Sequence, residues 1–471
     1  MEKVTLKKVI TRFAPSPTGT LHIGGVRTAL FNYVYAKKHE GEFLVRIEDT
    51  DKERSTKEFE KNILDSLDLI GLSPDQPPIN QSQRLDVYKA AAEKIINSNQ
   101  AYYCDCSMER LDKMRSEQQA NGQKPQYDGK CRNRNLSKSD NTVLRLKTPI
   151  DGEVIVKDYV RGDITFNNSE LDDLIIMRSD GTPTYHLCNV VDDYEQGVTT
   201  VIRGEDHISN TPRQIHIQNA LGYPVLEYAH LPLVLGPDKK RLSKRHAATS
   251  LEEYKSEGYL DSAILNTLAR LGWSRGEKEV FYMDDLLKDF EITEIQKAGA
   301  IFDITKLDFL NIQHLSNLDL NQFINFLIPF LKELKIDIES HSKKDLLITS
   351  MRSSAPTLKA IAKNLECYFK DVNEYDQTAI NKFLLGSSKI LEDLKLKLSE
   401  VYDWNESSLD EVLKNYREEE GLKVPMVNQP LRIAMTGSTN SPSLGLTLSL
   451  FDKDEAIRRI DSLIKFVETD N

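Results

Sequence analysis

The chain lacks the features of a membrane or secreted protein. Its 471 residues include only 5 cysteines, and no run of about 18 apolar residues could span a bilayer. The first ten residues alternate charged and apolar side chains and have no apolar core of a signal peptide. Three of the cysteines fall within 28 residues, which is not the framework of a disulfide-stapled domain. These absences predict a globular cytoplasmic protein that makes no membrane contact.

A positive net charge is also missing. The formal net charge is −11, whereas simple nucleic-acid-binding domains are strongly basic. A local basic patch is still compatible with nucleic-acid binding, because charges beyond a Debye length of about 8–10 Å are screened. The length allows three or four domains.

The first 70 residues alternate strand-like and helix-like patterns. Residues 9–13 and 42–47 are short β-like runs, and apolar positions at helical spacing occupy residues 26–34 between them. Ser55 and Glu58 have the spacing of a capping box, which predicts the start of a second helix. This order of strand, helix, strand and helix is typical of a parallel, doubly wound α/β sheet.

The pattern changes near residue 72. From there to about residue 190, short helices mix with turns rich in glycine, proline and asparagine, which we interpret as an inserted α+β domain. The α/β pattern then returns, because residues 198–203 are strand-like and Thr211-Pro212 predicts a helix start that Gly222 ends. Beyond residue 250 strand signals almost vanish. The last third is therefore predicted to be helical, with helices near residues 321–334, 357–369, 379–401 and 453–467.

Two short segments carry side chains suited to a polyphosphate. Residues 15–25 form a Gly/Pro-rich loop that opens a helix, at the edge where parallel α/β sheets bind ligands and where a helix N-terminus favours phosphate. Within this loop His22 can donate to a phosphoryl oxygen as charge develops there. Residues 238–246 form a dense basic loop that can clamp a triphosphate. Taken singly, the first pattern is more often a structural turn and the second a solvated surface.

Taken together, the two segments resemble the signatures of a known enzyme family. Residues 22–25 (HIGG) and 241–245 (RLSKR) are similar to the HIGH and KMSKS motifs of class I aminoacyl-tRNA synthetases. Gly25 stands in place of the last His of the first motif, and Arg241 replaces the first Lys of the second and keeps its charge. Further motifs narrow the resemblance to the glutamyl/glutaminyl branch and to bacterial glutamyl-tRNA synthetases: residues 12–19 (RFAPSPTG), 46–51 (RIEDTD), 185–193 (YHLCNVVDD) and 203–206 (RGED).

The resemblance covers essentially the whole chain and implies a two-step reaction. L-Glutamate would react with Mg²⁺-bound ATP to give glutamyl-adenylate, and the glutamyl group would pass to the 3′ end of tRNA(Glu). Positioning and neutralisation of charge dominate such chemistry. The implied protein is a cytoplasmic monomer with a Rossmann-like parallel-sheet catalytic domain, an α+β insertion and an all-α anticodon-binding region. Its expected parts are the first half of the catalytic domain (1–100), an inserted acceptor-end-binding domain (101–188), the second catalytic half with the KMSKS-like loop (189–250), a helical stem-contact region (251–320) and a helical anticodon-binding region (321–471).

The resemblance also assigns individual residues. His22 and Lys244 are expected to be catalytic, because they would stabilise the phosphates. Arg12 and Arg203 are placed near the carboxylates of glutamate, where a guanidinium fork suits a planar anion, and Glu48 near its α-ammonium. The glutamate pocket is expected to be completed by Ala14, Ser16, Tyr185 and Asn189. The expected ATP-binding residues are His22, Gly24, Gly25, Arg241, Leu242, Ser243, Lys244 and Arg245.

A cysteine cluster suggests a metal. The thiolates of Cys104, Cys106 and Cys131 suit tetrahedral Zn²⁺, and their spacing resembles the zinc-binding insertion of some bacterial glutamyl-tRNA synthetases. The fourth ligand stays open: Asn133 stands where some relatives have His, whereas Tyr127 has the spacing found in related glutamyl-queuosine tRNA synthetases. Bound zinc would be structural, and the alternative is three free thiols. The other two cysteines are expected to be buried as small apolar residues: Cys188 and Cys367.

The alternatives differ mainly in the last third of the chain. The helices there are expected to bind the anticodon, although Tyr368, Phe369 and Trp404 are of a kind more often found in a core than stacked on bases. A glutaminyl-tRNA synthetase would have β-barrels in this region, and a glutamyl-queuosine enzyme would lack the region. A non-catalytic tRNA-binding paralogue predicts eroded motifs, whereas His22 and Lys244 are intact. A nucleotidyltransferase that acts without tRNA would give the helical region no purpose. Whether tRNA(Gln) is also charged, and whether activation needs bound tRNA, is not decided by the sequence.

Overall fold

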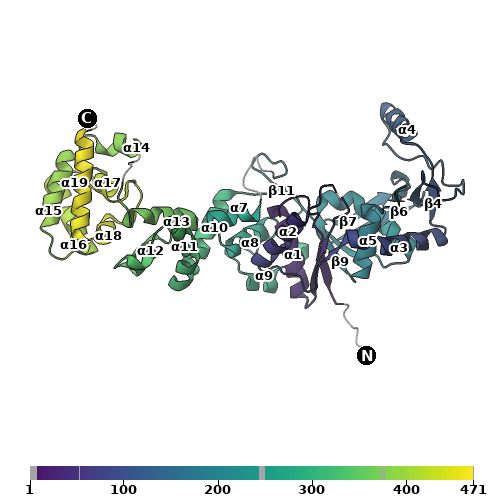
Figure 1. Cartoon of the computed structure of the whole chain (residues 1–471), viewed down its shortest axis with the longest axis horizontal. Coiled ribbons are helices and arrows are strands. Elements are labelled where there is room, and N and C mark those ends of the chain that lie inside the picture. The colour runs from purple at the N-terminus through teal and green to yellow at the C-terminus, as the bar shows by residue number, and fades with distance from the viewer. Residues whose placement is uncertain (1–7, 52, 243–249, 373–374, 376, 470–471) are drawn as a thin grey trace. The chain divides into compact units, whose positions relative to one another are not determined.

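A computed structural model describes residues 8–51, 53–242, 250–372, 375 and 377–469. The chain divides into two compact units. The first comprises Met1–Glu253 and Ile264–Ile304, and the second Tyr254–Ala263 and Thr305–Asn471. Among the described residues every strand lies in the first unit, and the second is helical (Figure 1). The predicted change from α/β to all-α structure is therefore confirmed.

The first unit contains a parallel sheet. Strand β1 (Ile10–Phe13) pairs with β2 (Glu42–Ile47), which pairs with β3 (Ile79–Asn80). A second group has the order β7-β6-β10-β9, in which β9 (Thr200–Gly204) and β10 (Glu227–Leu231) are parallel. The two groups adjoin where the backbone N–H of Thr199 donates to the carbonyl of Ile10 at 2.9 Å. The carboxyl ends of β1, β2, β9 and β10 thus face one edge, as expected of a doubly wound fold.

Helices pack on this sheet through their predicted apolar faces. In α1 (Ile23–Lys38) the side chains of Val26, Ala29, Leu30 and Val34 are fully buried. After α1 the chain must turn back close to the start of β1. A Cβ on Gly41 would lie 2.0 Å from the carbonyl oxygen of Val9, so only glycine fits there. The other helices of this part of the chain are α2 (Lys57–Leu69), α3 (Leu85–Asn97), α5 (Tyr185–Glu195) and α6 (Thr211–Leu221). The buried faces of α3, α5 and α6 share one hydrophobic core.

The cap predicted for the second helix is wrong by one residue. The N-cap of α2 is Thr56, whose Oγ1 accepts from the N–H of Phe59 at 3.1 Å. Since the third residue of this helix is Phe59, it has no carboxylate to return a bond, and the Ser55–Glu58 box does not form. The predicted limits of α6 are confirmed, because Thr211-Pro212 begins it and Gly222 follows it with φ +70°.

The region between the two halves of the sheet has two parts. Strands β4 (Ala101–Cys104), β5 (Val143–Leu146) and β8 (Ile175–Met177) form an antiparallel sheet near α4 (Met108–Ala120), in agreement with the predicted α+β insertion. The hairpin of β6 (Glu153–Asp158) and β7 (Gly162–Asn167) instead extends the parallel sheet, because β6 pairs with β10. The other elements of this unit are β11 (Val234–Leu235), α9 (Met283–Asp289) and β12 (Ala300–Ile301). Two helices have residues in both units: α7 (Leu251–Glu257) and α8 (Asp261–Arg270).

The second unit is a set of packed helices. They are α10 (Ile304–Asn317), α11 (Leu320–Glu333), α12 (Lys344–Met351), α13 (Leu358–Leu365), α14 (Gln377–Ala379), α15 (Ser388–Ser399), α16 (Glu406–Glu419), α17 (Val424–Thr436), α18 (Leu444–Ser449) and α19 (Lys453–Thr469). The single helix predicted for residues 379–401 is wrong, because a π-turn over Ile380–Leu384 ends the first part and Gly386 turns with φ +76° before α15 begins.

Of the three aromatic residues expected in the core, Tyr368 is buried there, and Phe369 and Trp404 are partly buried against it. Tyr368 stacks on Phe451 with ring centroids 4.9 Å apart, and the indole of Trp404 donates to the carbonyl of Phe451 at 3.0 Å. Arg352 donates to the carbonyl of Leu315 at 3.0 Å, near the C-terminus of α10. None of the described helices is long and apolar enough to cross a membrane.

Candidate active site

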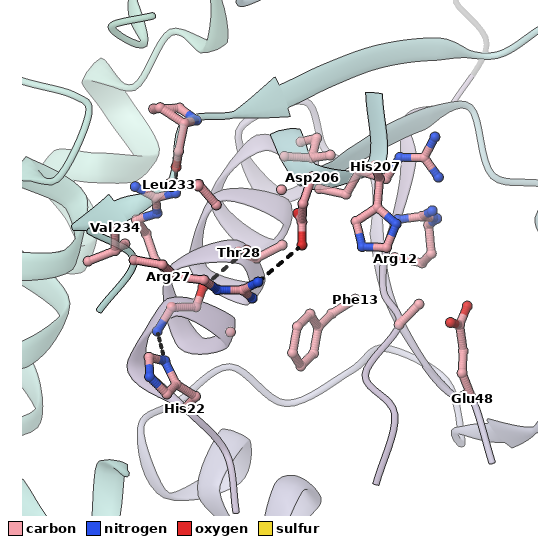
Figure 2. A pocket seen from close by; sticks show the side chains of 18 of the residues that line it. Arg12, Phe13, His22, Arg27, Thr28, Glu48, Asp206, His207, Leu233 and Val234 are labelled. Carbon is pink, nitrogen blue, oxygen red and sulfur yellow. Dashed lines mark hydrogen bonds and ion pairs between the residues drawn. The ribbon is translucent and has the colours of Figure 1, made fainter. Parts of the chain in front are cut away.

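A cavity of about 590 Å³ opens at the carboxyl ends of the parallel strands (Figure 2). It brings together segments from β1, the loop after β2, the N-termini of α1 and α5, the end of β9 and the segment after β10. Most of the predicted residues lie on its wall. The predicted residues that line it are Arg12, Ala14, His22, Gly24, Gly25, Glu48, Tyr185, Asn189, Arg203, Arg241 and Leu242.

Three predicted residues lie outside the described part of the chain: Ser243, Lys244 and Arg245. Ser16 is described, but its side chain is exposed on the loop after β1 and is not among the residues that line the cavity. Its assignment stays a prediction.

One side of the cavity is held by a buried charge network. Asp193 accepts from Arg12 Nε at 3.0 Å and from Arg46 at 2.6 Å. Arg46 also reaches Glu48 Oε1 at 3.4 Å, and Asn189 Nδ2 donates to the same oxygen at 3.0 Å. Burial raises the pKa of Glu48, although Arg46 and Arg12 oppose this shift. The network places the Glu48 carboxylate and the Arg12 guanidinium on one wall, so it offers a negative and a positive recognition group together.

Arg203 supplies a second buried cation. Its Nε donates to His230 Nε2 at 3.2 Å and its second terminal nitrogen to Thr211 Oγ1 at 2.8 Å. The remaining terminal nitrogen is buried without a hydrogen-bond partner among the described residues. Burial lowers the pKa of Arg203, and the nearby Arg12 lowers it further. A buried guanidinium with no carboxylate partner calls for an anionic ligand, because unpaired buried charges are costly.

His22 lies at the N-terminus of helix α1 (Figure 2). It is the N-cap, and its Nδ1 accepts from the backbone N–H of Gly24 at 3.0 Å. Burial lowers the pKa of His22, and the charge of Arg241 lowers it further, so the imidazole is neutral near pH 7. With Nδ1 engaged as an acceptor, the proton resides on Nε2. His22 therefore presents a hydrogen-bond donor beside the positive end of a helix dipole, an arrangement that suits phosphate.

The opposite wall comes from a tight turn after β11. The backbone N–H of Gly236 donates to the carbonyl of Lys240 at 2.8 Å, and that of Leu242 to Val234 at 3.0 Å. This turn leaves Arg241 largely exposed at the cavity rim, 3.7 Å from Asp206. A long cationic side chain so placed can reach a polyphosphate that enters the cavity.

Comparison with known proteins agrees with this geometry. The profile of the catalytic domain of class I tRNA synthetases for E and Q matches residues 8–309. The chain belongs to this synthetase family. A profile described as an anticodon-binding domain matches residues 322–464.

Relatives of this synthetase match along its whole length. It is 43% identical to glutamate–tRNA ligase 2 of Halorhodospira halophila over 97% of this chain and 98% of the relative. It is 42% identical to the glutamate–tRNA ligase of Thermodesulfovibrio yellowstonii, with 97% and 99% covered. Among solved structures, the glutamate tRNA ligase of Elizabethkingia meningosepticum in complex with its amino acid superposes with a TM-score of 0.86 at 32% identity. That match covers 98% of this chain and 100% of the other.

Several residues of the synthetase cavity were missed by sequence reasoning. Arg27 lies in α1 and donates to the carbonyl of Leu271 at 2.8 Å, and burial lowers its pKa to about 10. His207 lies 3.2 Å from the hydroxyl of Tyr185, and burial lowers its pKa to about 4. The signal for Arg27 was a charged residue on an otherwise apolar helix face. The other lining residues without a predicted role are Phe13, Thr28, Ile202, Gly204, Asp206, Pro232, Leu233 and Val234.

The synthetase also brings its cysteine cluster together, as predicted. The Sγ atoms of Cys104, Cys106 and Cys131 all lie within 4.8 Å of one another. The hydroxyl of Tyr127 is 3.4 Å from Cys104 Sγ and 3.6 Å from Cys106 Sγ, and it accepts from the backbone N–H of Cys131 at 2.9 Å. Asn133, the other candidate for a fourth ligand, is exposed. The hydroxyl of Tyr127 therefore lies close to all three cysteines, and a second oxygen, Asp105 Oδ1, lies 3.2 Å from Cys131 Sγ alone.

The remaining cysteines are also packed against other groups. Cys188 is buried in α5, and burial raises its pKa. Cys367 is half-buried beside the core of the second unit, and burial raises its pKa to about 12. Both stay protonated near neutral pH. The predicted burial is confirmed for Cys188, whereas Cys367 is only half-buried.

Proposed function

We propose that the chain is a glutamate–tRNA ligase. It would activate L-glutamate with ATP and transfer it to the 3′ end of tRNA(Glu). The observation that supports this substrate most directly is the pair of buried guanidinium groups, Arg12 and Arg203, in one cavity with the carboxylate of Glu48. Glutamate carries two carboxylates and one ammonium group, so its charges match this set.

In the first step a carboxylate oxygen of glutamate attacks the α-phosphorus of ATP. The bond from that phosphorus to the bridging oxygen breaks, and pyrophosphate leaves. His22 Nε2–H, Arg241 and Lys244 would stabilise the charge on the phosphates, with Ser243 and Arg245 beside them. ATP brings Mg²⁺, which neutralises part of that charge. In the second step a terminal ribose hydroxyl of tRNA attacks the acyl carbon, and AMP leaves.

The amino acid would be held by its charged groups. Arg12 and Arg203 would bind carboxylates, Glu48 would accept from the α-ammonium, and Tyr185 and Asn189 would close the pocket with Ala14 and Ser16. A glutamine side chain leaves the buried nitrogen of Arg203 without an anion. Glutamate is therefore favoured over glutamine by the cost of an unpaired buried charge. The helical second unit further favours this proposal over a glutaminyl-tRNA synthetase, which would have β-barrels there.

A charging assay tests the proposal. Purified protein with ATP and Mg²⁺ is given tRNA(Glu) or tRNA(Gln), each with labelled glutamate or glutamine. Glutamate is expected on tRNA(Glu), and the other arms show whether tRNA(Gln) is also charged. A preference for glutamine would contradict the proposal, and no charging by protein that retains its fold would favour the non-catalytic paralogue.

Lys244 has a separate test because it lies outside the described residues. Lys244→Ala should reduce glutamate activation far more than glutamate binding, since the lysine would contact only the phosphates. Comparable losses in both would contradict its assignment.

Zinc is the second part of the proposal. A tetrahedral Zn²⁺ with bonds of about 2.3 Å to sulfur and 2.0 Å to oxygen has ligand–ligand edges of about 3.5–3.8 Å. The 3.4 and 3.6 Å separations of Tyr127 Oη from two thiols, and the 3.5 Å between Cys106 and Cys131, fit these edges. Cys104 is the third thiolate. We propose that these four residues hold a structural Zn²⁺.

Nearby arginines support an anionic ligand set. Three thiolates and a phenolate exceed the charge of Zn²⁺ by two. Arg134 lies 3.4 Å from Cys131 Sγ, Arg110 lies 3.7 Å from Cys106 Sγ, and the Arg145 guanidinium lies 3.8 Å from the centre of the Tyr127 ring. These cations would balance the excess negative charge. Metal analysis of freshly purified protein that finds no zinc would contradict the site.

The other parts of the chain would bind tRNA. In this proposal residues 101–188 hold the acceptor end, residues 251–320 contact the stem and residues 321–471 read the anticodon. Because tRNA is charged where proteins are made, the site of action would be the cytoplasm. We also expect a monomer, which light scattering on the purified protein can check.

A further inference from the structure

A buried chain of three side chains lies behind the cavity. Asp158, at the end of β6, accepts from His230 Nδ1 at 2.6 Å, and His230 Nε2 lies 3.2 Å from the donor Nε of Arg203. The side chains of Asp158 and His230 are fully buried. Neither residue lines the cavity, whereas Arg203 does. His230 Nε2 also lies 3.1 Å from Thr211 Oγ1, which does not line the cavity, so Arg203 is the partner of His230 that lines it.

The contacts of Asp158 decide how its carboxylate is used. Oδ1 accepts from the backbone N–H of Val160 at 2.9 Å and of Arg161 at 2.8 Å, and Oδ2 accepts from the backbone N–H of His230 at 3.0 Å. Burial alone would raise the pKa of Asp158, but the hydrogen bonds from His230 and these amides lower it. The carboxylate is thus ionised and can only accept.

An ionised Asp158 determines the tautomer of His230. Since Asp158 accepts at Nδ1, that nitrogen carries the proton, and in the neutral imidazole Nε2 is left as an acceptor. Burial lowers the pKa of His230, and the imidazole faces the cations Arg203 and Arg12 and the ring of His207, with Asp158 as the opposing anion. Arg203 has only donors, so an acceptor at this position is the group that can hold its Nε.

Two acceptors on different elements therefore orient the Arg203 guanidinium. His230 on β10 holds Nε, and Thr211 on α6 holds one terminal nitrogen at 2.8 Å. With two of its nitrogens held, the plane of the guanidinium is fixed. The third nitrogen, which has no hydrogen-bond partner among the described residues, is left to the ligand.

We propose that Asp158 and His230 are positioning residues that orient Arg203 toward the side-chain carboxylate of the amino acid. This inference rests on the proposed glutamate ligase function and assigns specificity to two residues that do not touch the substrate. Asp158 reaches the site from the β6–β7 hairpin. The sequence places this hairpin in the inserted region, but it pairs with β10.

Two substitutions of His230 separate positioning from packing. In His230→Gln the amide oxygen reaches the place of Nε2 and can accept from Arg203, so the KM for glutamate should stay within about threefold of the wild type. In His230→Asn the shorter amide stops near Asp158 and leaves Arg203 Nε unpartnered. The KM for glutamate should then rise about 10- to 100-fold, while the KM for ATP stays unchanged.

His216→Asn is the matched control. His216 is a buried histidine of the same unit whose Nε2 lies 2.9 Å from Asn168 Oδ1, and it does not line the cavity. Its substitution should leave the KM for glutamate unchanged even if the melting temperature falls. A purely structural role for His230 predicts equal effects of Gln and Asn, or parallel losses for ATP and glutamate, and either result overturns the proposal.

A second variant decides the matter if His230→Asn does not fold. In Asp158→Asn the side-chain amide donates a hydrogen bond to His230 Nδ1, so the imidazole proton moves to Nε2. His230 Nε2–H then faces Arg203 Nε–H, and two donors oppose each other. The KM for glutamate should again rise about tenfold or more, and an unchanged value overturns the proposal. Wild-type charging runs in the same assay. If the wild type charges another amino acid, the proposed function fails, and the positioning role is read from the KM for that amino acid.

Discussion

Asn189 and Glu48 are 141 residues apart in the chain and are joined by a 3.0 Å hydrogen bond from Asn189 Nδ2 to Glu48 Oε1. The direction of the Asn189 amide is set from behind, because Gln214 Nε2 donates to Asn189 Oδ1 at 3.2 Å. Arg46 contacts the same carboxylate oxygen as Asn189. Both hydrogen bonds that the described residues make to this carboxylate go to Oε1, so Oε2 is the oxygen that can accept from an ammonium group in the cavity.

This geometry makes Glu48→Gln informative. The substitution keeps the shape but removes the negative charge, so the KM for glutamate should rise about 10- to 100-fold, as for the loss of a charge-assisted hydrogen bond. The KM for ATP should not change. Glu42→Gln is the control, because Glu42 begins β2, the strand that Glu48 directly follows, but contacts Lys8 and Gln76 near the surface. Equal losses for both substrates would mean that Glu48 acts through the fold.

The two nitrogens of His22 can be tested separately. His22→Asn keeps a good N-cap for α1 but loses Nε2, so glutamate-dependent ATP–pyrophosphate exchange with tRNA present should fall about 100-fold with little change in melting temperature. His22→Ala loses both groups and should also destabilise the protein by about 1 kcal/mol. Full exchange activity in His22→Asn would show that Nε2 has no part in the reaction.

His186 should make the first unit sensitive to acid. Burial lowers its pKa to about 4, and the charges of Arg213 and Arg203 add to the shift. Because an unfolded histidine has a pKa near 6.5, the unfolded chain takes up the proton first. Stability is therefore full above pH 6.5 and is lost as the pH falls toward about 4.

The contribution of His186 can be measured by urea unfolding between pH 7 and pH 4. His186→Phe should reduce the pH slope of the free energy of unfolding by up to about 1.4 kcal/mol per pH unit, the value for one proton. An identical slope in both proteins would show that His186 titrates normally.

The proposed zinc ligands can be distinguished from ordinary thiols. Tyr127→Phe should weaken zinc binding by more than the roughly 10- to 100-fold that follows loss of an outer-shell partner, and Cys131→Ser should abolish it. Cys367→Ser, in the second unit, should leave the zinc content unchanged. Metal analysis after dialysis against a chelator measures how much zinc each variant retains. If Tyr127→Phe retained as much zinc as the wild type, the fourth zinc ligand would be Asn133 or a water molecule instead of Tyr127.

Much of the fold follows from local patterns. The buried stripe Val26, Ala29, Leu30 and Val34 was readable because helical periodicity places these residues on one face, and burial then follows. The N-cap of α2 could not be predicted from the sequence, because Ser55 and Thr56 are both good caps and the packing of the preceding loop decides between them. The predicted helix over residues 379–401 failed for a similar reason, since the turn at Gly386 depends on neighbouring helices.

The residues of the candidate site also fall into those that the sequence predicted and those that it did not. His22 was predicted from the helix start that follows the Gly/Pro-rich loop, and Arg203 from the resemblance of residues 203–206 to a synthetase motif. Asp158 and His230 lie in none of these motifs, since each acts through a partner on another element. Asp193 ends the motif at residues 185–193, but its contact with Arg12 and Arg46 was not predicted.

The sequence by itself determined the order of elements, the change from α/β to helical structure and the residue types available for phosphate, glutamate and zinc. These depend on spacing along the chain. Only the tertiary structure decided which oxygen of Glu48 contacts Arg46 and Asn189, that the hydroxyl of Tyr127 lies among the three thiols and that His230 accepts from Arg203. A hydrogen bond between distant residues depends on distances of a few ångströms, and these are set only when the sheet and its helices pack together.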